Sequence, residues 1–349
     1  MKSLSFLVIP FLVLGMLMAN VGALKAAEPL RVCCTTPDLG SLAQEIGGHA
    51  VEVAVFVGGQ EDPHALTAKP SDVQKLSKAQ AFVLVGFGLE AGWAPALLSR
   101  SRNSAIQLGT SGYLDASEVI QPIHDVPQGT VITRALGDQH AEGNPHYLLD
   151  PVNGLQVARW LAERFTNIRP DLSTHFKTQV KDFEQKWGAK AFGREISQRY
   201  PLDKLIALQE QGKLSAFLQK TEELPQLKGW FAQSEALAGT PFLADHGQWP
   251  YFAKRFRIVI ERSLEPKPGV PPNTSYLQNL VVWVKNENIP GILASPYFSP
   301  RTLNFMAEHS SAKIIPVAHQ VGARPQANSY LEMIDYNMSV LYNCCSVKP

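Results

Sequence analysis

The order of apolar segments predicts an α/β fold of two parallel-sheet lobes joined by a long connecting helix. Strand-length apolar runs alternate with helix-length amphipathic stretches over residues 28–151, and again late in residues 196–349. This alternation is typical of parallel sheets covered by helices. Between these regions, residues 152–195 carry helical apolar stripes with few turn signals. The 349 residues are enough for two domains.

In the first lobe, Pro-Ser-Asp at 70–72 is a good helix start, with Ser71 as the expected cap. The predicted strands are 30–35, 51–57, 81–85 and 105–108, and the predicted helices are 37–46, 71–79 and one through Trp93 and Leu97.

The middle of the chain has two helical stripes, interrupted at Arg169-Pro170. The second, Leu172 to Trp187, is the expected connecting helix between the lobes. Residues 196–240 read as a helical insertion in the second lobe. Beyond it, the predicted strands are 242–244, 257–261, 291–295 and 313–317, and the predicted helices are 249–256, 274–286, 301–309 and 330–342. The proline-rich run 266–272 predicts a rigid turn.

Composition argues against one class of partner. The formal net charge is +1 and charged residues make up 18% of the chain. There is therefore no electrostatic case for nucleic-acid binding.

Residues 1–27 read as an export signal. Lys2 gives a minimal positive region, residues 4–18 are apolar, and small residues follow. A membrane anchor is the alternative, but the apolar run is short for a span. No cysteine follows in a lipobox-like setting, so we expect no lipid attachment. The predicted location is periplasmic, or otherwise extracytoplasmic.

The four cysteines form two adjacent pairs, Cys33–Cys34 and Cys344–Cys345. Neighbours on a strand point to opposite faces, so Cys33 and Cys34 are not expected to share a partner. We expect free thiols with at most one disulfide, and no thiolate metal site.

Three histidines follow predicted strands or precede predicted helices. His64 lies between a strand and a helix with Pro63 before it, Pro145-His146 repeats that arrangement, and His246 follows a third strand. Loops at the carboxyl ends of parallel strands bind ligands. A single such histidine would suggest only a surface turn, whereas three together suggest a site.

These motifs resemble those of the zinc/manganese-type substrate-binding proteins of bacterial ABC transporters. The similarity runs from about residue 30 to residue 343, with several motifs in the same order. The motifs are Asp62-Pro63-His64, Pro70-Ser71-Asp72, Gly86-Phe87-Gly88-Leu89-Glu90, Asn144-Pro145-His146, Asp150-Pro151, Asp245-His246-Gly247, Glu265-Pro266-Lys267-Pro268-Gly269 and Ser329-Tyr330.

The resemblance implies a metal site in the cleft between the lobes, with His64, His146 and His246 as ligands. His319 stands where many relatives have an aspartate, which makes it the expected fourth ligand. The alternative is three histidines plus water. Imidazole suits Zn²⁺, whereas Mn²⁺ prefers oxygen and is the less expected metal.

The other histidines are expected to lie outside the site. The long histidine-rich loop of the family is missing, and His124 and His140, its only remnants, are expected in a solvated loop. His49, His175 and His309 are expected to be structural.

The implied function is capture of a divalent metal ion by a monomer and its delivery to an ABC permease, without enzymatic activity. One alternative is an exported metal-binding adhesion or interaction protein. Another is a zinc metallohydrolase with Glu61 or Asp245 as the base. The sequence has no His-Glu-x-x-His helix and no nucleophile elbow, which argues against the hydrolase.

Overall fold

The computed structural model describes residues 28–124, 126, 140–267 and 269–346. The expected export signal, residues 1–27, lies outside the described residues. Across the described ranges, no helix is both long enough and apolar enough to span a bilayer.

The first lobe is a four-stranded parallel sheet in the order β2-β1-β3-β4. The strands are β1 (Leu30–Cys34), β2 (Val51–Val55), β3 (Ala81–Leu84) and β4 (Tyr113–Asp115), and the helices are α1 (Pro37–Gly47), α2 (Pro70–Lys78) and α3 (Ala94–Ser101). β3 is buried along its whole length, as expected for a central strand of a parallel sheet.

The second lobe repeats this plan in the order β6-β5-β7-β8, again all parallel. Its strands are β5 (Pro241–Ala244), β6 (Val259–Ser263), β7 (Gly291–Ala294) and β8 (Lys313–Pro316). Its helices are α10 (Pro250–Phe256), α11 (Thr274–Asn286), α12 (Pro300–His309) and α13 (Tyr330–Ser346).

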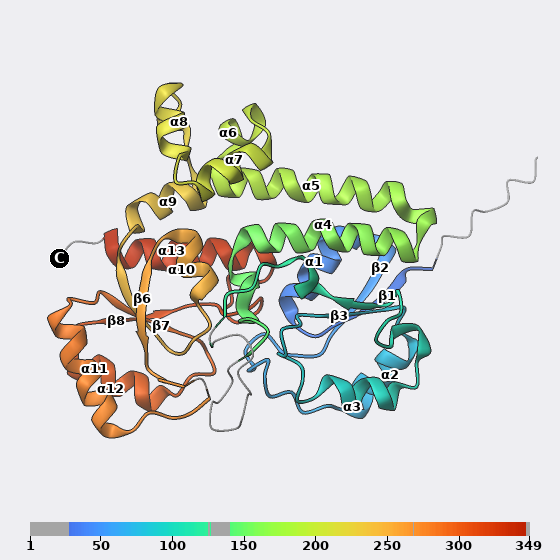
Figure 1. The fold of residues 1–349 in the computed structure, drawn as a ribbon, viewed down its shortest axis with the longest axis horizontal. Coiled ribbons are helices and arrows are strands. Elements are labelled where there is room, and N and C mark those ends of the chain that lie inside the picture. Colours follow the sequence, from blue (N-terminus) through green and yellow to red (C-terminus); the bar gives the residue numbers. More distant parts are fainter. Residues whose placement is uncertain (1–27, 125, 127–139, 268, 347–349) are drawn as a thin grey trace, which may run out of the picture.

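Two long antiparallel helices lie side by side over the first lobe, the first running away from the second lobe and the other returning towards it (Figure 1). They are α4 (Pro151–Ile168) and α5 (Ser173–Phe192), followed by the helical insertion α6 (Arg194–Arg199), α7 (Leu202–Glu210), α8 (Leu214–Lys220) and α9 (Gly229–Leu237). Asp150 caps α4 by accepting a hydrogen bond from the Val152 N–H (2.8 Å), and Pro151 occupies its first turn. α5 packs on α1 and α4 and also on α9 and α13, so it contacts elements of both lobes. Short 3₁₀ turns are η1 (Gly48–Ala50), η2 (Ser104–Ile106), η3 (Ala116–Val119), η5 (His146–Leu149), η6 (Pro170–Leu172) and η7 (Leu224–Gln226).

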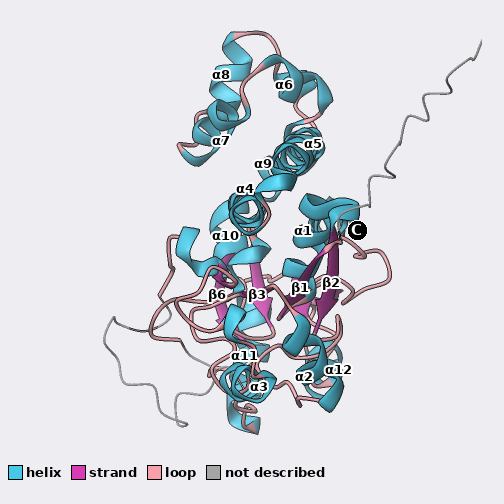
Figure 2. Ribbon diagram, turned by 90° about the vertical axis from the view of Figure 1, so that its right-hand side faces the viewer, coloured by secondary structure: helices cyan, strands magenta, loops and turns pink. Residues whose placement is uncertain are grey.

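The helices form layers on both faces of the sheets (Figure 2). On one face, a single apolar core runs through both lobes, from Val83 and Leu161 to Phe242 and Met338. On the other face each lobe has its own apolar cluster, one under α2 and α3 and one under α11 and α12. The lobes therefore share a core on the side of α4, α5 and α13.

Three local expectations were wrong. Residues 105–108 are no strand: η2 occupies this region, Leu108 is 81% exposed, and the fourth strand is β4 beyond the turn at Gly109–Gly112. Ser71 does not cap α2, because the helix begins at Pro70 and Asp72 accepts from the Lys69 N–H (2.9 Å). The expected strand at 257–261 begins two residues later, since Arg257 ends α10 in a left-handed conformation.

All four cysteines are free thiols. Cys33 packs into the cluster under α2 and α3, whereas Cys34 packs into the shared core, so the two neighbours point to opposite faces of β1 as predicted. Burial raises the pKa of Cys33 to about 12, so this thiol is protonated at neutral pH.

Candidate metal-binding site

The four predicted ligands all lie in loops at the carboxyl ends of strands or in a turn beside them. His64 follows β2, His146 begins η5, His246 follows β5, and His319 follows β8. Two lobes therefore contribute to one region, as the interlobe site requires.

The same type of hydrogen bond fixes the backbone at three of these histidines. In each loop, a side-chain oxygen just ahead of the histidine accepts a hydrogen bond from its backbone N–H. The distances are 2.9 Å from Asp62 to His64, 3.0 Å from Asn144 to His146 and 2.8 Å from Asp245 to His246. The contacts of Asp62 and Asn144 are Asx turns, which fix the backbone without a strand or helix, whereas Asp245 accepts from the residue that directly follows it. The Asp and Asn residues of the motifs thus place the imidazoles.

The imidazoles of His64, His146 and His246 pack side by side. The ring centroids are 5.2 Å apart for His64 and His146, and 5.9 Å apart for His146 and His246. Asn144 of the first lobe donates to the Gly247 carbonyl of the second lobe (2.8 Å), directly beside this contact. The structure therefore places these three predicted residues next to one another.

A fourth imidazole joins the cluster from an unexpected place. His140, expected in a solvated loop, stacks on His64 with centroids 5.4 Å apart and an Nε2–Nε2 distance of 3.3 Å. It lies beside Gly88, whose φ of 81° belongs to the Gly86–Gly88 turn. The solvated-loop expectation was therefore wrong for His140, whereas His124 is exposed as expected.

His319 sits behind Tyr297 rather than against the other imidazoles. Its ring is edge-on to Tyr297 at 4.7 Å, and the Tyr297 hydroxyl lies 3.3 Å from His246 Nε2. His319 Nε2 donates to the Glu61 carbonyl (3.2 Å), and its buried Nδ1 has no hydrogen-bond partner in the described structure. With the proton on Nε2, Nδ1 presents a lone pair. That lone pair is what a metal ligand needs.

The loop of His319 contacts the loop of His64 across the lobes. The Gln320 amide donates to the carbonyls of Gly58 (2.8 Å) and Glu61 (3.0 Å). Gly59 approaches the backbone of Gly322 so closely that a Cβ there would lie 2.5 Å from its carbonyl carbon. Only glycine fits this contact.

The environment keeps several of these imidazoles neutral. Burial lowers the pKa of His140 and of His319 to about 4, and burial together with the neighbouring histidines lowers the pKa of His146 well below its ordinary value. A neutral imidazole is the metal-binding form. Burial opposes ionisation of Asp62, but its hydrogen bonds with His64 hold its pKa below the ordinary value, and Asp62 lies 2.9 Å from His64 Nδ1. This carboxylate–histidine contact is typical around metal ligands and leaves His64 Nε2 as the acceptor.

The rings nevertheless pack against one another rather than around a common point. Among the described residues, no three His, Cys, Asp or Glu side chains stand in a metal-coordinating arrangement. The set of His64, His146, His246 and His319 thus stays a prediction.

The two carboxylates considered as hydrolytic bases have structural contacts. Asp245 is fully buried and accepts from the side chains of Gln248 (3.1 Å) and Trp249 (3.0 Å) and from the Ser295 N–H (2.8 Å). Glu61 accepts from the Gly58 N–H (2.7 Å) and so closes its own turn. Both carboxylates shape the loops.

The remaining histidines lie in structural contacts outside the cluster. His175 Nε2 donates to the Gly47 carbonyl (2.8 Å) with His49 edge-on to its ring, and His309 stacks on Phe305. This agrees with the structural role expected for His49, His175 and His309.

The chain matches the protein family described as "Zinc-uptake complex component A periplasmic" over residues 32–199 and 204–344. The manganese ABC transporter substrate-binding lipoprotein PsaA of Streptococcus anginosus is 22% identical over 352 residues, covering 97% of each chain. The crystal structure of ZnuA is similar with a TM-score of 0.66 and 19% identity, covering 91% of this chain and 99% of that chain. A mutant structure of the laminin-binding adhesin of Streptococcus agalactiae has a TM-score of 0.65 and 20% identity, covering 90% and 99%. At these identities, the structural likeness shows the two-lobe fold.

Proposed function

We propose that the chain captures one Zn²⁺ ion between its lobes and delivers it to an ABC permease, because it belongs to the zinc-uptake complex component A periplasmic family. The membership confirms the resemblance carried by the histidine and glycine motifs. The members of this family are solute-binding components of transporters rather than enzymes. These binding components act outside the cytoplasm. We further propose that residues 1–27 direct export and that the mature protein works as a monomer.

One observation carries the proposal: imidazoles from both lobes meet in one cluster, in which burial lowers the pKa of His146 and so favours its neutral form. The donors are nitrogen atoms, which favours zinc over the oxygen-preferring manganese. The relative from S. anginosus is named for manganese, so the two metals must be compared directly. Metal analysis of dialysed protein, followed by zinc–manganese competition, tests the choice. One zinc per chain, not displaced by equimolar manganese, is the expected result.

For the ligand set, we propose His64, His146, His246 and His319. His319 is supported by its unpartnered Nδ1, while His140 is the competing fourth ligand because its Nε2 lies 3.3 Å from that of His64. Protons compete with zinc for imidazoles below about pH 6.5, so each lost histidine should flatten the pH dependence.

Zinc affinity against pH for the wild type, His319→Ala and His140→Ala separates these ligands, with exposed His124→Ala as the control. We expect weaker binding and a shallower pH slope in His319→Ala, and wild-type behaviour in His124→Ala. If His319→Ala keeps the wild-type affinity and slope while His140→Ala loses both, His140 is the fourth ligand.

A further inference from the structure

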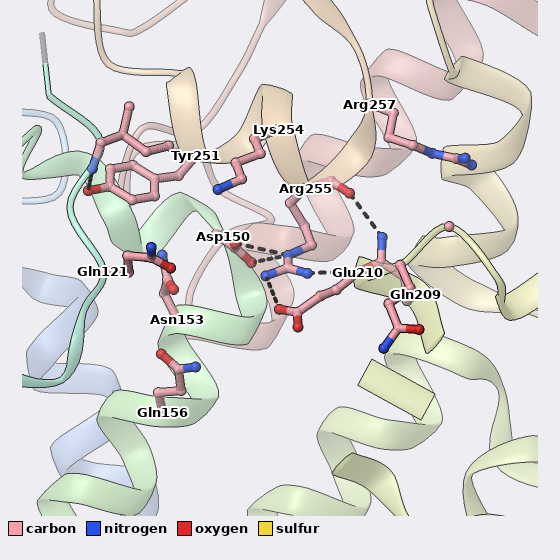
Figure 3. A pocket seen from close by; sticks show the side chains of 13 residues that line it. Gln121, Asp150, Asn153, Gln156, Gln209, Glu210, Tyr251, Lys254, Arg255 and Arg257 are labelled. Atoms are coloured by element: carbon pink, nitrogen blue, oxygen red, sulfur yellow. Dashed lines mark hydrogen bonds and ion pairs between the residues drawn. The ribbon is translucent and has the colours of Figure 1, made fainter. Parts of the chain in front are cut away.

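A buried ion pair joins the two lobes behind the histidine cluster. Arg255 of α10 binds Asp150 through its Nε, at 2.8 Å and 2.9 Å from the two carboxylate oxygens (Figure 3). The two side chains are 11% and 8% exposed. A buried charge is costly unless it is paired, so each holds the other in place.

The pair is connected to both halves of the candidate metal site. Asp150 ends η5, the turn that begins with His146, and caps α4. Arg255 lies on α10, which follows the His246 loop and packs against η5. The Trp249 indole at the start of α10 donates to Asp245 (3.0 Å), the residue that anchors His246. The link therefore runs from one ligand loop to the other.

The helical insertion completes the link. Arg255 Nη1 donates to Gln209 Oε1 (2.8 Å) and Nη2 donates to Glu210 Oε1 (3.1 Å), both at the end of α7. The Gln209 amide in turn donates to the Arg255 carbonyl (3.1 Å). A pocket of about 610 Å³ lies beside these groups, lined by both lobes and α7, so polar contacts rather than apolar packing join the three parts here.

We propose that Arg255, Asp150 and the end of α7 form a latch that sets the spacing of His146 and His246 and so the rate at which bound metal leaves. In this role Arg255 and Asp150 are positioning residues, and the helical insertion of residues 196–240 serves to hold Arg255. The inference rests on the proposed function, since it concerns the affinity of that same site.

The test uses zinc-loaded, full-length mature protein mixed with excess chelator, and it measures the zinc dissociation rate and the Kd. Arg255→Met removes the charge but keeps the aliphatic stem, while Asp150→Asn keeps a capping oxygen. The double variant removes both charges, so neither is left buried without its partner. Glu210→Gln removes only the charge of the partly exposed α7 carboxylate that pairs with Arg255. Arg257→Met is the matched control, because Arg257 pairs with Glu235 and does not bridge the lobes.

Arg255→Met and Asp150→Asn should each weaken zinc binding about tenfold or more, mainly through faster dissociation, as for other groups that orient metal ligands. The double variant should be no weaker than Arg255→Met alone, Glu210→Gln should give a smaller change in the same direction, and Arg257→Met should match the wild type. Folded variants that lose thermal stability but keep the wild-type dissociation rate would overturn the latch while leaving the proposed function intact. A wild type that binds no zinc would overturn both.

Discussion

At the scale of single residues, the site depends on side chains that hold the backbone rather than on the histidines alone. Asp62, Asn144 and Asp245 each anchor the histidine that follows them. Glu90 likewise holds the backbone of the Gly86–Gly88 turn, and Gly88 of this turn lies beside His140. Glu90 accepts from the Thr35 hydroxyl (2.7 Å) and from the N–H groups of Val85 (2.7 Å) and Gly86 (3.1 Å).

Glu90 yields a pH prediction. Burial raises its pKa from 4.5 to about 7, so folding favours the protonated form. Its contribution to stability is fully present below pH 4.5 and is lost as the pH rises through 7. The free energy of unfolding of the wild type, relative to Glu90→Gln, should fall by on the order of 3 kcal/mol over that range. Urea unfolding at several pH values measures this difference, and parallel pH profiles would refute the assignment.

The residue scale also separates what the sequence could predict from what it could not. His64, His146 and His246 were predictable because local Pro and Asx signals mark their loops. His140 was not, because its contact with His64 joins residues far apart in the sequence, and no residue next to it in the sequence signals that contact. The nearest signal is Gly88, whose open side faces the His140 ring.

At the scale of elements, buried runs of apolar residues located most strands and helices within a few residues. The failure at 105–108 arose because a short, mostly apolar segment can be a strand or a turn, and β4 has only three residues. Ser71 failed as a cap because the helix already begins at Pro70, which places Ser71 inside its first turn. The connecting helix was predictable because its stripe of large apolar residues persists for several turns.

The last residue of that stripe is Trp187 of α5. It is fully buried, lies edge-on to Trp230 (5.6 Å) and donates to the Pro151 carbonyl at the start of α4 (2.8 Å). Trp187→Ala should therefore lower the free energy of unfolding by about 3–5 kcal/mol. Leu108→Ala, at a site 81% exposed, should change it by less than about 0.5 kcal/mol. Equal effects of the two substitutions in chemical denaturation would contradict the role given to α5.

At the scale of the whole molecule, the lobes are joined by more than one helix. They share a continuous apolar core, and α13 of the second lobe bonds back to the first, where the Tyr330 hydroxyl donates to the Leu148 carbonyl (2.7 Å). Close packing of this kind resists hinge motion. The sequence indicated a helical connection through α5 but not the shared core, which depends on how the lobes pack.

Metal binding should therefore produce only a small local closure. Small-angle scattering curves of the metal-free and zinc-loaded forms should nearly superimpose. A change of several ångströms in the radius of gyration would mean that the shared core opens, contrary to its packing.

The central claim, that the imidazole cluster holds zinc, is tested most directly by thermal melts with and without the metal. At free zinc a hundredfold above the Kd, binding to the folded state alone should stabilise the wild type by about 2.7 kcal/mol and raise its Tm. His309→Ala, which removes a histidine stacked on Phe305 outside the cluster, should keep the full shift, whereas His64→Ala should lose most of it. No zinc-dependent shift in the wild type, or an undiminished shift in His64→Ala, would contradict the account.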